Sequence, residues 1–158
     1  MVKNMKNYNS AKDEIEKIFL ELKVTYNYVE LDDDINYIIT FNTYGKLKSL
    51  NSVRGVLYLH HLDFSLNLLV PNIFTLRDTD DVIDTLDIYE AVNDINSGLP
   101  FGSFLIEDNK HIFYRSSINC GENYMGLNEG ILKRQFDIFI GGLESLFAII
   151  KRIGQSNE

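Results

Sequence analysis

Four residues of this chain belong to types that bind zinc or act as nucleophiles, namely His60, His61, His111 and Cys120. A zinc site brings such ligands together at one point, usually from recognisable spacings in the sequence. His60 and His61 are adjacent in a predicted strand, where neighbouring side chains point to opposite faces. Their spacing from His111 and Cys120 matches no zinc motif. We therefore expect no metal site.

Cys120 is the single cysteine and lies in the glycine-containing segment SINCGENYMG. A catalytic thiolate needs a base, and the base needs a group that orients it. His111 is the histidine nearest in sequence, so the two side chains would have to meet in space. An unreactive thiol is the simpler interpretation, because a lone cysteine without a family signature does not identify an enzyme. Convergence of His111, Cys120 and a carboxylate would support the alternative of an unrecognised enzyme.

Acidic clusters occur at residues 32–34 (DDD) and 77–84 (RDTDDVID). An EF-hand calcium loop has Gly at its sixth position and Glu at its twelfth, whereas counting from Asp78 gives Ile83 and Tyr89. We interpret the first cluster as a turn and the second as the start of a helix, where carboxylates offset the helix dipole. The hydrolase elbow Gly-x-Ser-x-Gly, the Walker A motif and the GxGxxG motif are absent. The sequence thus predicts neither a cofactor nor catalysis.

The composition is that of one globular domain. The chain has 158 residues, 45% of them hydrophobic, and a formal charge of −8. Negative charge disfavours binding to phosphate backbones and to anionic membranes. No run approaches the ~20 apolar residues of a membrane span, and the single cysteine suits a reducing compartment. We expect a cytoplasmic protein that binds neither nucleic acid nor membrane, with one domain over 10–153 between loose segments 1–9 and 154–158.

Hydrophobic periodicity places a helix and four strands in the first half of the chain. Ser10 and Asp13 form an S-x-x-D capping pattern that predicts a helix from Ser10 to about Lys23. Alternating apolar residues predict strands at 26–31, 35–42, 53–61 and 64–70, the last ending at Pro71. Residues 43–52 are expected to form a polar connection. The short gaps favour antiparallel pairing.

A second helix is predicted over 78–98, with Asp80 and Asp81 in its first turn and Gly98 as a left-handed residue at its end. Its expected buried stripe comprises Val82, Leu86, Tyr89, Val92 and Ile95. A hairpin of 103–107 and 111–118 follows, turning at DNK.

The last predicted helix covers about 127–153 and contains Gly141 and Gly142, which together cost roughly 2 kcal/mol of helix propensity. The pair indicates either a kink or a close crossing over the sheet or over another subunit.

Residues 91–118, AVNDINSGLPFGSFLIEDNKHIFYRSSI, and the order of the elements resemble the YbjN family, whose domain is similar to type III secretion chaperones. The positions that match the recurring residues of that family are Asn93, Asn96, Phe104 and Arg115. The resemblance implies an α+β fold of order α-β-β-β-α-β-β-α, with helices packed on a curved antiparallel sheet. The residues themselves leave three or four strands open before the second helix.

Proteins that look like this are non-enzymatic, and the secretion chaperones are small acidic dimers that hold an extended stretch of another protein. The resemblance therefore implies a chaperone-like or regulatory module of sensory transduction. It would act as a homodimer through an apolar helix face near Gly141 and Gly142. The partner segment would bind at a sheet edge or in an apolar groove.

Candidate contacts for that segment are aromatic residues expected to be exposed, together with one arginine: Tyr26, Tyr28, Phe101, Phe104 and Arg115. Arg115 should share a strand face with Phe113 and Ser117. Its simpler role is to cover apolar surface or to pair with an acid. A small-molecule sensor, with a pocket between the sheet and the last helix, is the alternative function.

Overall fold

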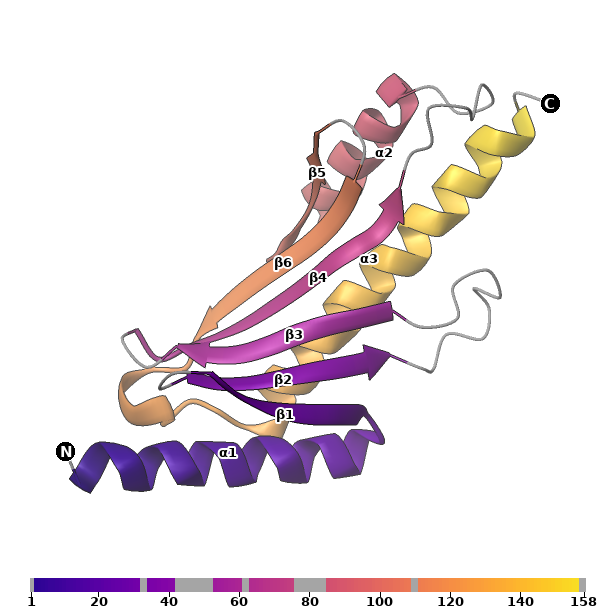
Figure 1. Ribbon diagram of the computed structural model, residues 1–158. Coiled ribbons are helices and arrows are strands. Elements are labelled where there is room, and N and C mark those ends of the chain that lie inside the picture. The colour runs from indigo at the N-terminus through magenta and orange to yellow at the C-terminus, as the bar shows by residue number, and fades with distance from the viewer. Residues whose placement is uncertain are drawn as a thin grey trace.

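The computed structural model describes residues 2–31, 34–41, 53–60, 63–75, 85–108 and 111–156. The elements in chain order are α1 (Val2–Leu22), β1 (Thr25–Leu31), β2 (Asp34–Phe41), β3 (Val53–His60), β4 (Ser65–Thr75), α2 (Thr85–Gly98), β5 (Ser103–Glu107), β6 (His111–Asn119), the short 3-10 helix η1 (Glu122–Tyr124) and α3 (Glu129–Ser156). All six strands form one antiparallel sheet in the order β1-β2-β3-β4-β6-β5 (Figure 1). The α+β class is confirmed, with four strands before α2 where the family resemblance implied three.

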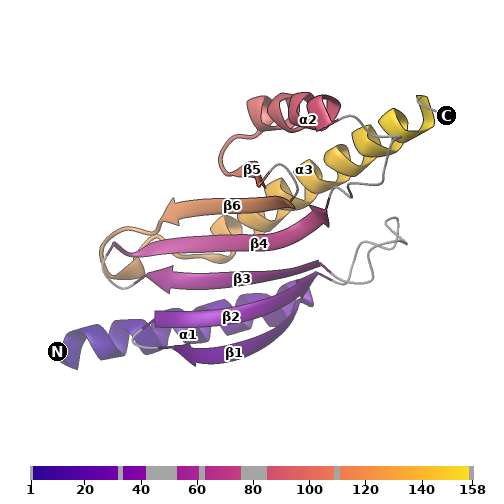
Figure 2. The ribbon, with the colours of Figure 1, turned by 45° about the horizontal axis from the view of Figure 1, so that its top comes forward.

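The core lies between one face of the sheet and the helices. Figure 2 shows α1 and α3 behind the sheet, and α2 beside β5. Side chains in β2 and β3 alternate between buried and less buried positions, as expected for a sheet covered on one side. The ring of Phe19 in α1 lies 5.1 Å from that of Tyr37 in β2 and 6.4 Å from that of Phe136 in α3. These contacts join both helices to the same face.

Helix α1 begins at Val2, so the prediction that Ser10 caps its start is wrong. Ser10 lies inside the helix, and residues 2–9, predicted to be loose, belong to it. Those residues contain neither Gly nor Pro, so no helix breaker stops the helix from extending toward the N-terminus. The predicted end is confirmed. Lys23 has a φ of 56°, and the Val24 N–H donates to the carbonyl of Phe19, which is a Schellman ending.

Strand β4 continues through Pro71 to Thr75, so the prediction that it ends at Pro71 is wrong. Its pairing with β6 shifts between Val70 and Phe74, and Asn72 within this bulge has a φ of 52°. A bulge removes residues from the ladder of hydrogen bonds, and this is where a sheet tolerates proline. The strand therefore continues past Pro71 because its pairing with β6 is interrupted there.

The buried stripe of helix α2 agrees with the predicted one only in the second half of the helix. Val92 and Ile95 are buried as predicted, but Ile88 and Ala91 are buried in the first half, where Leu86 and Tyr89 were predicted and are exposed. Both sets follow a helical period, so periodicity alone does not choose between them. Val82, Asp80 and Asp81 lie outside the described residues. Gly98 does not adopt the predicted left-handed conformation.

The C-terminal helix α3 continues through Gly141 and Gly142 to Ser156, and so includes residues 154–156 that we expected to be loose. A Cβ on Gly142 would lie 2.7 Å from the Phe104 ring, whereas one on Gly141 would meet nothing within 4 Å. Of the two interpretations of the glycine pair, close crossing over the sheet therefore applies, and it applies to Gly142. Within the described residues, no helix is long and apolar enough to span a bilayer.

Candidate functional site

One face of the sheet carries no helix in the part of the chain that the structure describes (Figure 1). The strand register assigns the residues of this uncovered face. Ile38 lies opposite Val56, Val56 opposite Leu69, and Leu69 opposite Arg115. Ile38 and Leu69 are 39% and 36% exposed, and Val56 is half-buried. An apolar row therefore crosses the middle of the uncovered face from β2 to β4.

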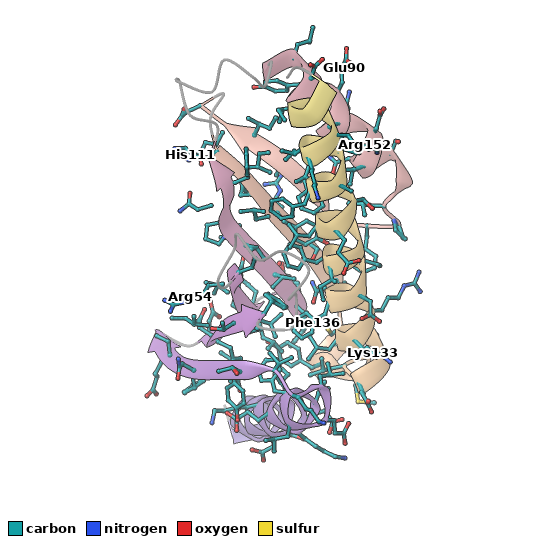
Figure 3. The ribbon with its side chains drawn as sticks, turned by 90° about the vertical axis from the view of Figure 1, so that its right-hand side faces the viewer. Arg54, Glu90, His111, Lys133, Phe136 and Arg152 are labelled. Carbon is teal, nitrogen blue, oxygen red and sulfur yellow. The ribbon has the colours of Figure 1, made fainter. Side chains whose placement is uncertain are left out.

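Two arginines border this apolar row, Arg115 at its end next to Leu69 and Arg54 beside it, two residues before Val56. Arg54 lies opposite Thr40 in β2, and Arg115 lies between Leu69 of β4 and Ser103 of β5. Both side chains are exposed. In Figure 3, Arg54 and His111 lie on the side of the sheet away from α3, whereas Phe136 points from α3 into the core. The uncovered face thus presents apolar contact area with two positive charges next to it.

Carboxylates are scarce on the uncovered face. Among its described strand residues, the only ones are Asp34 at the start of β2 and Glu107 at the end of β5. These two strand ends lie at opposite corners of the sheet. The whole chain, by contrast, has a formal charge of −8. Most of the described carboxylates therefore lie away from this face.

The predicted contact residues divide between the two faces. The alternation of β6 is confirmed, because Ile112, Tyr114 and Ser116 are buried whereas Arg115 and Ser117 are exposed. Phe104 is only 1% exposed, so the expectation that it is an exposed aromatic is wrong. Phe101 is half-buried.

Tyr26 and Tyr28 lie opposite Ile39 and Tyr37, which places them on the helix-covered face. Tyr26 packs against the Phe19 ring at 4.8 Å. Tyr28 is partly exposed at the border, where the Lys12 ammonium lies 4.4 Å from its ring centroid. These tyrosines complete the junction of α1 with β1, and they are not part of the uncovered face.

Sequence reasoning found Arg115 but missed Ile38, Arg54, Val56 and Leu69. The signal available was the alternation of residues 35–42, 53–61 and 64–70. Alternation separates two sets of side chains, but it does not say which set the helices cover when both contain apolar residues. Register and helix placement decide that question.

Comparison with protein-family models matches residues 11–148 to the YbjN family, which carries the description "Putative bacterial sensory transduction regulator". The chain belongs to the YbjN family. No curated protein matches it. The family is thus described as a regulator and not as an enzyme.

Within this YbjN domain, Asn96 joins α2 to the edge of the sheet. Its Oδ1 accepts a hydrogen bond from the Phe104 N–H, and its Nδ2 donates to the Phe104 carbonyl, both at 2.8 Å. A carboxamide pairs here with β5 as the backbone of another strand would. The side chain of Phe104 meanwhile packs against Tyr114, Phe139 and Gly142. Two of the residues that carried the resemblance are therefore structural.

The residues considered for an enzyme in the sequence do not converge in this YbjN protein. His111 and Cys120 lie at opposite ends of β6, roughly 30 Å apart for an extended strand. Burial raises the pKa of the Cys120 thiol, which disfavours the reactive thiolate. Among the described residues, no group of three or more His, Cys, Asp or Glu side chains could hold a metal ion. His61 lies outside the described residues.

A small polar cluster is buried between β6 and α3. Gln135 is fully buried, and its Nε2 donates to Ser116 Oγ at 2.8 Å and to the Leu66 carbonyl at 3.4 Å. Gln135 Oε1 and the Tyr114 hydroxyl have no hydrogen-bond partner among the described residues. Burial raises the pKa of Tyr114, so its hydroxyl stays protonated. At this cluster a polar ligand atom could bond with Gln135 Oε1 and with the Tyr114 hydroxyl.

Proposed function

We propose that this YbjN protein is a non-enzymatic binding module, chaperone-like or regulatory, that captures a segment of a partner protein on the uncovered face of its sheet. The observation that carries the proposal is the apolar row of Ile38, Val56 and Leu69 at the centre of a face without helices. An antiparallel sheet that faces water on one side normally presents polar residues there. Apolar residues grouped on such a face are typical of an interaction surface.

The face is a better candidate than the edge at β5. An edge strand recruits another strand through its outward N–H and C=O groups. At β5, the Phe104 N–H and C=O are already bonded to Asn96, and the strand has only five residues. Capture by strand addition at β5 would require the loss of both hydrogen bonds, whereas binding to the uncovered face requires none.

Site-specific photo-cross-linking in native cells tests the proposal. A photo-reactive amino acid replaces Leu69, at the centre of the uncovered face, or Lys133, which lies on the outer side of α3 (Figure 3). We expect the probe at position 69 to label one short segment of a defined protein and the probe at 133 not to label it. Identical products from both positions, or none from 69, would contradict capture on this face.

We further propose a homodimer in the cytoplasm, on the resemblance to the secretion chaperones and on the single cysteine. Gly142 is enclosed by Phe104 and Leu99, so it belongs to the interior of one protomer. The exposed neighbours of Gly141 on α3 are Asp137, Glu144 and Ser145, which would make a contact there polar. Light scattering during size-exclusion chromatography should give twice the mass of one chain. A mass equal to one chain at all concentrations would contradict the dimer.

The alternative function is a small-molecule sensor, and the buried cluster of Tyr114, Ser116 and Gln135 favours it. A ligand that donates to Gln135 Oε1 and bonds the Tyr114 hydroxyl would satisfy both atoms. Close packing opposes it, because the Tyr114 hydroxyl occupies the place that a Cβ of Gly102 would take. A metabolite screen by thermal shift distinguishes the two functions, since a sensor ligand should stabilise the wild type and not Gln135→Leu.

A further inference from the structure

We propose that the uncovered face selects an extended segment in which carboxylates alternate with apolar residues, and that Arg54 and Arg115 receive the carboxylates. This inference rests on the proposed function and specifies the chemistry of the partner. The occupant is therefore a segment of another protein with the local pattern acid-x-apolar-x-acid.

The two arginines of the face lie apart from its two carboxylates, which are at the strand ends Asp34 and Glu107. Arg54 and Arg115 are exposed, and neither forms an ion pair with a carboxylate of the described residues. The neighbours of Arg54 and Arg115 in the register are Thr40, Leu69 and Ser103. In a chain with a charge of −8, two arginines whose register neighbours carry no carboxylate form a local positive region. Such a region attracts a negatively charged partner and orients it.

The spacing of the two arginines fits an extended peptide. Arg115 lies opposite Leu69, Leu69 lies opposite Val56, and Arg54 is two residues before Val56. Two strand spacings across the sheet and two residues along it place the Cα atoms of Arg54 and Arg115 about 12 Å apart. In an extended segment, residues i and i+4 are on the same side and about 13 Å apart. Residue i+2 then lies between them, over the apolar row.

Two other occupants fit the charges less well. A second copy of the chain, docked face to face, would place its arginines against a face whose centre has no carboxylate. The arginines of the two copies would then repel one another without any carboxylate to pair with. A nucleic acid would contact the arginines, but the remainder of the protein, at −8 overall, would repel its backbone. A partner segment with isolated carboxylates satisfies the face without that repulsion.

Fluorescence anisotropy with designed peptides tests the inference. Three labelled peptides share one sequence with Val at the middle position and carry, two residues to either side of it, Glu, Ser or Lys. We expect the Glu peptide to bind the wild type on the order of tenfold more tightly than the Ser peptide at low salt. The preference should shrink as salt is added, because exposed charges are screened.

Charge reversal supplies the decisive comparison. The double variant Arg54→Glu/Arg115→Glu should lose the preference for the Glu peptide and acquire one for the Lys peptide. Lys133→Glu, the matched reversal on the outer side of α3, should behave as the wild type (Figure 3). Both variants alter only exposed side chains, and their thermal unfolding checks that they are folded.

The outcomes separate this inference from the function on which it rests. If all three peptides bind equally and Leu69→Ser weakens all of them, the face captures segments but the charge selection is overturned. If no peptide binds, or if the double variant keeps the preference for Glu, the selection is likewise overturned. Cross-linking from position 69 then tests independently whether the uncovered face captures a partner, because that experiment uses the native partner.

Discussion

At the scale of single residues, the carboxamide of Asn96 stabilises the edge of the sheet as a neighbouring strand would. Asn96→Ala removes both hydrogen bonds to Phe104 and leaves its backbone groups without those partners. We expect the free energy of unfolding to fall by about 1–3 kcal/mol, as measured by urea denaturation. Asn93→Ala is the matched control on the exposed side of the same helix, where alanine should leave stability unchanged or raise it by about 0.5 kcal/mol.

Cys120 illustrates how burial suppresses the reactivity of a side chain. The residue is 1% exposed, and its backbone N–H donates to the Phe64 carbonyl at 2.9 Å. Because burial raises the pKa of the thiol, the thiolate is scarce near neutral pH. Ellman's reagent at pH 8 should therefore react slowly with the folded protein and rapidly in denaturant. Equal rates in the two states would show that the thiol is accessible, and would return Cys120 to consideration as a nucleophile.

At the scale of elements, the crossing of α3 over β5 depends on one glycine of an adjacent pair. A Cβ on Gly142 would approach the Phe104 ring to 2.7 Å, and that ring is held by Tyr114 and Phe139. Gly142→Ala should lower the free energy of unfolding by about 1–3 kcal/mol through overpacking. Gly141→Ala should raise it by up to about 1 kcal/mol, because its Cβ enters open space and alanine favours the helix. Effects of the same sign in urea denaturation would contradict this crossing geometry.

At the scale of the whole molecule, the protein is a sheet with helices on one side, and two adjacent leucines of β4 test this asymmetry. Leu68 points into the core and is 1% exposed, whereas Leu69 lies on the uncovered face. Leu68→Ala should cost about 2–5 kcal/mol of unfolding free energy. Leu69→Ala should change it by less than about 1 kcal/mol, yet it should weaken partner cross-linking from a probe at position 56. A large loss of stability for Leu69→Ala would mean that another part of the chain covers this face.

Much of this architecture could be predicted from local patterns. The strands at 26–31, 35–42 and 53–61 and the hairpin after α2 were predicted to within a residue or two, because alternation and turn residues act over short distances. The errors have equally physical origins. Ser10 and Asp13 match a capping pattern but lie inside a helix, and Pro71 ends no strand because a bulge accommodates it.

The sequence by itself determined the element types, the antiparallel α+β class and the family, because these follow from periodicity and from a segment with recognisable residues. Only the tertiary structure decided which of two helical stripes on α2 is buried and which strand residues face solvent. It also decided that Asn96 pairs with Phe104 and that Arg54 and Arg115 share one face. Those outcomes depend on register and on which face the helices cover, and both are set by contacts between residues distant in the chain.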